Sequence, residues 1–82
     1  MSSPRERKKA RRRAERTMDE AWEAVLQDRL PFAEKLARRA IDGSEMNPRL
    51  WLDLGRILYR CGQPDDAEEA LRRALALAPP PG

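Results

Sequence analysis

Residues 51–62 read WLDLGRILYRCG, a run dense in large apolar side chains within a chain of 82 residues that is 38% charged. Trp51, Leu54 and Leu58 recur three or four residues apart, which places them on one face of a helix. Asn47 precedes the segment as an N-cap. None of these side chains is suited to catalysis, so the pattern indicates a segment that serves packing.

Helix signals fill the rest of the chain, and strand signals are absent. Ser3 and Glu6 have the spacing of a capping box, which favours a helix from Pro4 onward. Gly43 suits the left-handed conformation that ends a helix. The expected helices cover about residues 4–28, 31–42, 48–61 and 64–78. Short turns between them predict an all-α chain of two helical hairpins.

Composition excludes several classes of function. The chain has no His, so the commonest general base and metal ligand is missing, and its one cysteine, Cys61, can form neither an internal disulfide nor a zinc cluster. We therefore expect no enzymatic activity, no cofactor and no metal. No apolar run approaches the roughly 20 residues of a membrane span, and the basic N-terminus lacks the apolar segment of a secretory signal. A cytoplasmic protein is expected, and abundant Arg and Ala are typical of GC-rich bacterial genomes.

Charge is distributed unevenly along the chain. Residues 1–16 hold eight basic and two acidic groups, whereas the remaining 66 residues hold nine basic and twelve acidic ones. A basic N-terminal arm, residues 1–16, therefore precedes a mildly acidic body, residues 17–79, and a Pro-rich tail, residues 80–82. The basic residues of the arm are Arg5, Arg7, Lys8, Lys9, Arg11, Arg12, Arg13 and Arg16.

The body contains an internal repeat. AEKLARRAI at residues 33–41 returns as AEEALRRAL at residues 67–75, a period of 34 residues. The period resembles that of the tetratricopeptide repeat family. Residues 48–79 are similar to the family pattern, and residues 17–46 form a degenerate copy. The matching positions are Trp51, Leu54, Gly55, Leu58, Tyr59, Gly62, Ala67, Leu71, Ala74 and Pro79.

The resemblance implies a short solenoid that leaves apolar surface open. Repeats bury their apolar faces against their neighbours, and about three are usually needed for an independent array. Leu71, Leu75 and Leu77 of the last helix cannot all face the preceding helix, so we expect a partner, or a second copy, to cover them. Close packing of that hairpin is expected at Gly55 and Ala67.

The resemblance also implies a concave groove that binds a partner peptide. The groove positions transferred to this chain are Met18, Trp22, Val25, Arg49, Leu52, Arg56, Tyr59 and Arg60. Such a groove would be apolar on one side and cationic on the other, suited to an amphipathic segment that carries carboxylates. The alternatives are that Trp22 belongs to the hairpin core and that Arg56 and Arg60 form a solvated face.

Two functions follow as hypotheses. The first is a non-enzymatic adaptor, or accessory subunit of a larger protein complex, that docks through its helical hairpins. The second is an accessory subunit whose basic arm contacts the phosphates of RNA or DNA while the repeats hold a protein. The arm has no aromatic residue for base stacking and no Trp, Phe or Leu for membrane insertion. The alternatives are that it is a solvated tail or that it contacts an acidic protein surface.

Overall fold

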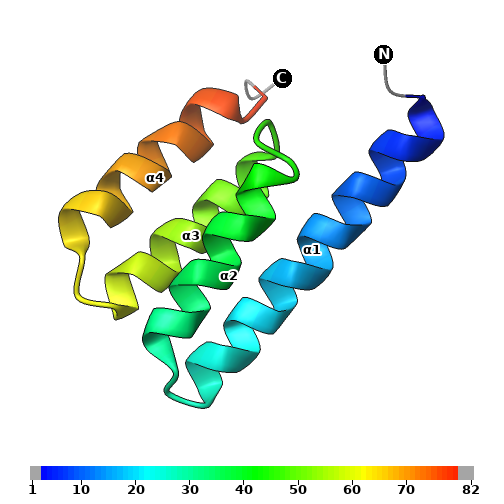
Figure 1. The fold of residues 1–82 in the computed structure, drawn as a ribbon. Coiled ribbons are helices and arrows are strands. Elements are labelled where there is room, and N and C mark those ends of the chain that lie inside the picture. The colour runs from blue at the N-terminus through cyan, green and yellow to red at the C-terminus, as the bar shows by residue number, and fades with distance from the viewer. Residues whose placement is uncertain (1–2, 80–82) are drawn as a thin grey trace.

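The computed structural model describes residues 3–79, and the expected tail at residues 80–82 lies outside them. This part of the chain is entirely helical, as predicted (Figure 1). The helix ends fall within two residues of the expected ones because caps and prolines mark most of them in the sequence. The elements are α1 (Pro4–Leu26), α2 (Leu30–Asp42), α3 (Pro48–Arg60) and α4 (Pro64–Leu77).

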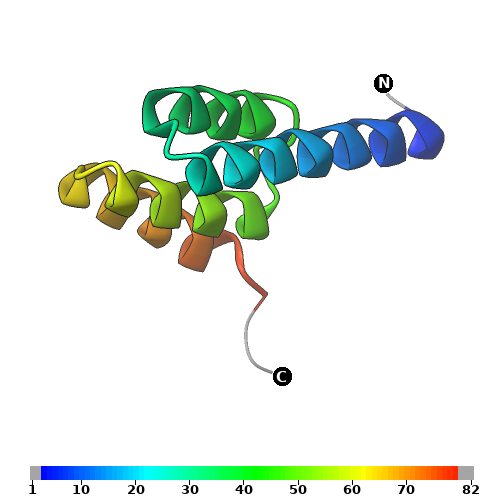
Figure 2. The same ribbon diagram turned by 90° about the horizontal axis from the view of Figure 1, so that it is seen from below.

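The four helices form an open stack of two antiparallel hairpins. Helices α1 and α2 form the first hairpin, and α3 and α4 the second. Helix α3 also packs against both helices of the first hairpin, whereas α4 contacts α3 and no other helix in the described part of the chain. Figure 2 shows α4 at one outer edge of the stack and α2 at the other. The chain is therefore a short solenoid with two different ends and not a closed bundle.

The 34-residue period holds at the level of the backbone. Asp28 and Gly62 are separated by this period, and both have positive φ angles, 59° and 76°. The adjoining hydrogen bonds also correspond, since the Arg29 amide donates to Ala24 O at 2.8 Å and the Gln63 amide to Leu58 O at 3.0 Å. The two hairpins are thus two copies of one local structure.

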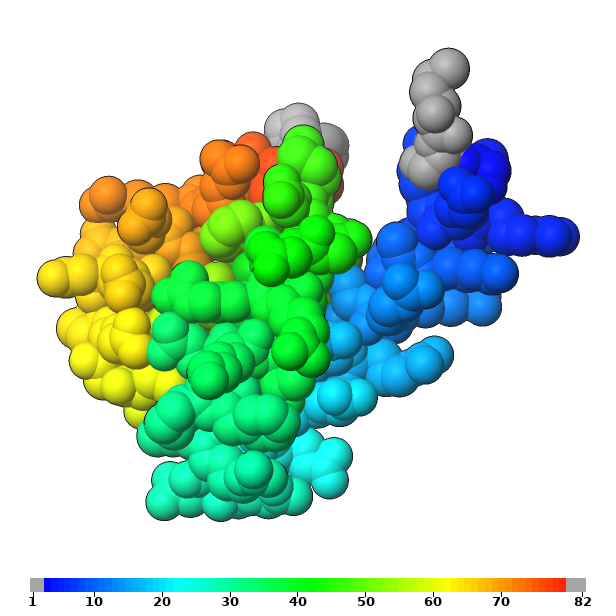
Figure 3. Space-filling model, in the orientation of Figure 1, coloured from blue at the N-terminus to red at the C-terminus, as the bar shows by residue number. Residues whose placement is uncertain are grey.

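Helix α1 unites the basic arm with the first repeat. Ser3 Oγ accepts the Glu6 amide at 3.2 Å, and the Glu6 carboxylate accepts the Ser3 amide, so the predicted capping box is present. The helix then continues for 23 residues without a break, and the expected boundary between residues 16 and 17 falls inside it. Its N-terminal half extends beyond α2 and stands apart from the rest of the molecule (Figure 3).

The core lies between the hairpins and within each of them. Its largest fully buried side chains are Met18, Leu50, Ile57 and Leu58. Alanines on α2 and α4 face it because small side chains permit close helix packing. The predicted core residue Trp51 is only half-buried: its indole N–H donates to Glu45 O at 2.7 Å, which ties α3 to the preceding turn.

Close approach of α3 and α4 depends on Gly55. A Cβ added there would lie 2.8 Å from Leu71 Cδ2 and 3.2 Å from the Ala67 carbonyl oxygen, closer than ordinary van der Waals contact. In the first copy the equivalent positions hold Ala21 and Ala37, both fully buried. The second hairpin thus pairs a glycine with a leucine where the first pairs two alanines, so a large side chain on one helix faces a small residue on the other.

The expected left-handed conformation of Gly43 is wrong. Its φ and ψ angles are −84° and −12°, in the right-handed helical region. The chain does not reverse at this residue because the turn continues through further local hydrogen bonds, Ser44 N to Ile41 O at 2.9 Å and Asn47 N to Ser44 O at 3.2 Å. The left-handed residues of the described chain, Asp28 and Gly62, lie inside the hairpin turns instead.

Candidate binding surfaces

A groove of about 760 Å³ runs between α1, the turn after α2, and α3. Of the residues expected in a groove, it contains Met18, Trp22 and Arg49. Three carboxylates also line it, and sequence reasoning did not anticipate them: Glu15, Asp19 and Asp53. The groove therefore carries both charge signs and is not the apolar and cationic surface that was expected.

Asp53 is the most perturbed group of this groove. Partial burial raises its pKa above the ordinary value of 3.8, and Arg49, a hydrogen bond with the Trp22 side chain, and Arg56 oppose that rise with smaller effects. A carboxylate at this position thus joins α3 to the tryptophan of α1. The sequence signal for Asp53 is its spacing. It follows the core residue Leu50 by three positions, so both lie on the side of α3 that faces α1.

The residues expected to form one groove are divided between two environments. Met18 and Val25 are buried, so they belong to the core and expose almost no surface to a partner, although Met18 borders the groove. They are buried because α3 packs against the first hairpin, which the transfer of groove positions did not take into account. Trp22 is half-buried in the groove. The other five residues lie exposed on α3: Arg49, which borders the groove, and Leu52, Arg56, Tyr59 and Arg60.

The second copy exposes positions that the first copy buries. Residue pairs separated by 34 positions have very different exposed fractions, 2% for Met18 against 36% for Leu52 and 7% for Val25 against 71% for Tyr59. The α4 residue Leu75 is 78% exposed, whereas its equivalent on α2, Ile41, is 5% exposed. We call this surface, formed by Leu52, Arg56, Tyr59 and Leu75, the open face.

Only one of the three leucines expected on the outer face of α4 is fully available. Leu75 is exposed, as expected, whereas Leu71 and Leu77 are half-buried. Leu71 is covered because its side chain lies against Gly55, where the absent side chain leaves room for it. Leu71 is therefore mainly a packing residue of the second hairpin.

A second groove, of about 590 Å³, lies on the other side of α3 and was missed by sequence reasoning. Trp51 forms part of its floor, and the Arg73 guanidinium lies 5.7 Å from the centre of the Trp51 ring. Arg38 of α2 and Asp66 and Glu69 of α4 also line this groove. Trp51 was expected in the core, but its half-buried ring instead borders this groove and contacts Arg73 of α4.

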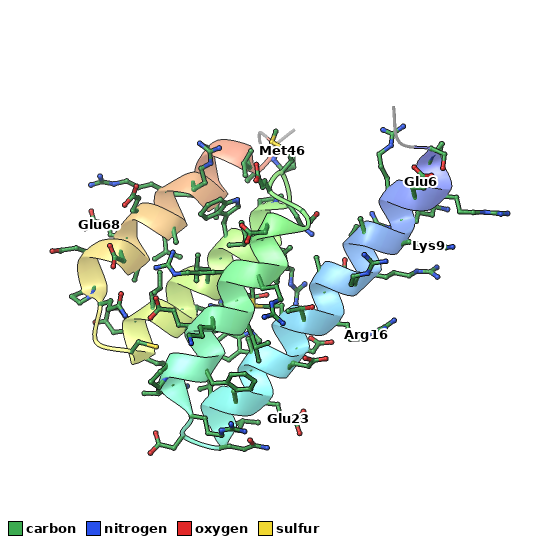
Figure 4. The ribbon with its side chains drawn as sticks, in the orientation of Figure 1. Glu6, Lys9, Arg16, Glu23, Met46 and Glu68 are labelled. Carbon is green, nitrogen blue, oxygen red and sulfur yellow. The ribbon has the colours of Figure 1, made fainter. Side chains whose placement is uncertain are left out.

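The basic arm presents its cations on an exposed helix. All eight of its basic residues are exposed. Of these eight, only Arg11 has a carboxylate of the described chain within 4.0 Å, that of Glu15 at 3.9 Å. Arg5, Lys8, Lys9 and Arg12 line one shallow surface together, because residues three or four apart share a helix face. Figure 4 shows Lys9 and Arg16 directed away from the body of the molecule.

The remaining reactive group is half-buried. Cys61 Sγ lies 3.6 Å from the Leu30 carbonyl oxygen, and burial followed by the nearby Glu34 charge raises the thiol pKa above its ordinary value of 9.0. Such a thiol is a poor nucleophile. Within residues 3–79, no helix combines the length and apolarity that crossing a bilayer requires.

The two stacked hairpins with matching turns define a helical-repeat protein. Within this class, the tetratricopeptide repeat family model matches residues 48–81, so this segment is a tetratricopeptide repeat and the resemblance noted in the sequence is confirmed there. No curated protein and no solved structure matched the chain. Repeats of this family typically serve as non-enzymatic modules for protein–protein interaction.

Proposed function

We propose that this chain is a non-enzymatic adaptor, or small accessory subunit, that docks onto a larger protein through its repeats. The observation that carries the proposal is the open face, where Tyr59 and Leu75 are 71% and 78% exposed. Two large apolar side chains exposed on one side of so small a chain favour association with another protein. A reducing compartment such as the cytoplasm accommodates the single free Cys61.

The proposal is tested by comparing matched variants in the host cell. Tagged wild-type chain, Leu75→Glu and Leu26→Glu are purified under mild conditions, with and without nuclease, and the bound proteins are compared by mass spectrometry. Leu26 is a suitable control because it is 85% exposed but lies at the end of α1, outside the open face. We expect a partner that the wild type and Leu26→Glu retain and that Leu75→Glu loses. Identical protein sets from all three chains would contradict the proposal.

We propose as a second function that the basic arm binds the phosphate backbone of RNA or DNA. The observation that favours it is the helical conformation of the arm, which holds Arg5, Lys8, Lys9 and Arg12 on one surface away from the acidic body. Phosphate contacts from such a surface supply affinity without base reading, and that affinity falls steeply with salt.

Salt titrations test this second function directly. Lys9, Arg12 and Arg16 are replaced together by Gln in the full chain, and Lys35, Arg39 and Arg60 are replaced by Gln in a control with the same net charge. If each arm residue contacts one phosphate of duplex DNA, the slope of log K against log salt becomes less negative by about 2.7 in the arm variant and remains unchanged in the control. Equal slopes for the arm variant and the wild type would exclude the arm as the contact.

A further inference from the structure

The two hairpins differ in whether another helix covers their equivalent faces. In the first copy, the face that contains Met18, Val25 and Ile41 is buried where α3 packs against α1 and α2. In the second copy the equivalent residues form the open face, and within residues 3–79 α4 has no helix beside it other than α3. The first copy therefore indicates what would fit on the second. A helix that packs against α3 and α4 in the way that α3 packs against α1 and α2 would cover the open face.

The chain cannot supply that helix to itself by stacking head to tail. A second copy would have to present α1 to the open face of the first, in the role that α3 plays. The α3 residues that are buried in this role, Leu50, Leu54 and Ile57, correspond to Arg16, Glu20 and Glu23 on α1, all of them exposed. Figure 4 shows Arg16 and Glu23 directed away from the body. Burial of these charges without partners would oppose such an assembly.

One substitution between the copies defines the charge of the missing helix. Trp22, which lines the first groove together with Asp53 of α3, corresponds to Arg56 in the open face. An arginine at this position would attract a carboxylate placed as Asp53 is placed, because a guanidinium and a carboxylate form a charge-assisted hydrogen bond. The open face is thus apolar at Leu52, Tyr59 and Leu75 and cationic at Arg56.

We infer that the open face binds an amphipathic helix of a partner protein. That helix carries large aliphatic residues at positions i, i+4 and i+7 and a carboxylate at i+3, the pattern that α3 itself has at Leu50, Asp53, Leu54 and Ile57. The inference rests on the proposed adaptor function and specifies the chemistry of its partner. The bound helix would cover Tyr59 and Leu75 and pair its carboxylate with Arg56.

The test uses the full-length chain and a probe that has the required pattern. The probe is a fluorescent synthetic peptide of residues 46–60, and its binding is followed by fluorescence anisotropy. We expect saturable binding at one site per chain. Arg56→Glu should weaken it about tenfold, and a peptide carrying Asp53→Lys should restore binding to that variant but not to the wild type. Leu75→Glu and Tyr59→Glu should each abolish binding, and Leu26→Glu should leave it unchanged. Far-UV circular dichroism verifies that each variant is folded.

Three results would overturn the inference. The first is a peptide that fails to bind the wild-type chain, and the second is binding to Leu75→Glu as strong as to the wild type. The third is a dimer in sedimentation equilibrium that Leu75→Glu dissociates, because a second copy would then occupy the face. In the first two cases the adaptor function would still stand if the host-cell comparison finds a partner lost only from Leu75→Glu, so the two proposals fail separately.

Discussion

Replacement of Gly55 by alanine measures how tightly α3 and α4 approach each other. Two effects oppose one another in this variant. Alanine is about 1 kcal/mol more favourable than glycine within a helix. The new methyl group, however, would lie 2.8 Å from Leu71 and 3.2 Å from the backbone oxygen of Ala67, and overpacking of this kind costs about 1–3 kcal/mol. We expect crowding to dominate and the free energy of unfolding to fall by about 1 kcal/mol.

The first copy indicates how the crowding can be relieved. It places Ala21 and Ala37 at the positions of Gly55 and Leu71. Leu71→Ala alone should cost about 1–2 kcal/mol, because the side chain is only half-buried. In the double variant the methyl group at residue 55 has room and the helix preference is retained. The two changes should therefore be coupled by about 2 kcal/mol, with the double variant more stable than the sum of the single effects implies.

Urea unfolding followed by circular dichroism at 222 nm provides all four free energies of this cycle. Ala21→Gly is the control, since it should cost about 1 kcal/mol through helix preference and relieve no crowding. Gly55→Leu, which no rotation of Leu71 can accommodate, should destabilise the chain more than any single variant of the cycle. A coupling near zero, or a Gly55→Ala variant more stable than the wild type by the full helix preference, would refute the close approach of these helices.

Three further outcomes are expected. Both Asp28 and Gly62 have positive φ angles, which glycine adopts without steric cost. In urea unfolding, Asp28→Gly should therefore stabilise the chain and Gly62→Ala should destabilise it, each by about 1 kcal/mol. Effects of the same sign at the two sites would contradict this. Asp53, whose pKa is raised on folding, binds protons more tightly in the folded chain, so its contribution to stability falls as pH rises from about 3.8 through the raised pKa of the folded chain. Asp53→Asn should become progressively more stable relative to the wild type across this interval and then level off, and a constant difference would argue against burial of the charge. Cys61 should react with iodoacetamide at pH 8 more slowly than glutathione does, whereas an equal rate would indicate an accessible thiol.

Most of the fold could be predicted because its signals are local. Ser3, Asn47 and the prolines at helix starts mark boundaries through backbone chemistry that does not depend on the rest of the molecule. The 34-residue period then fixes the hairpins. Gly43 and Asp28 were the exceptions. Which turn residue takes a positive φ depends on where the chain must reverse, and an aspartate can also occupy that conformation, at a higher energetic cost than a glycine.

The binding surfaces were less predictable because burial depends on neighbours that sequence positions alone do not reveal. Met18 and Val25 have the same place in their repeat as Leu52 and Tyr59, yet one pair is covered by the next hairpin and the other is not. The sequence showed that apolar surface would remain exposed. It did not show that Leu71 would be covered through the gap at Gly55.

The unbroken course of α1 has a mechanical consequence. A helix of 23 residues is roughly 35 Å long at 1.5 Å per residue, and it fixes the cationic end rigidly to the hairpins. Molecules held at the two ends of this rod would keep a constant distance and angle. Insertion of one residue after Arg13 would turn the surface of Arg5, Lys8, Lys9 and Arg12 by about 100° around the helix axis. The orientation of a molecule bound there, relative to one bound on the hairpins, would change while the buried contacts of α1 from Ala14 onward stay in place.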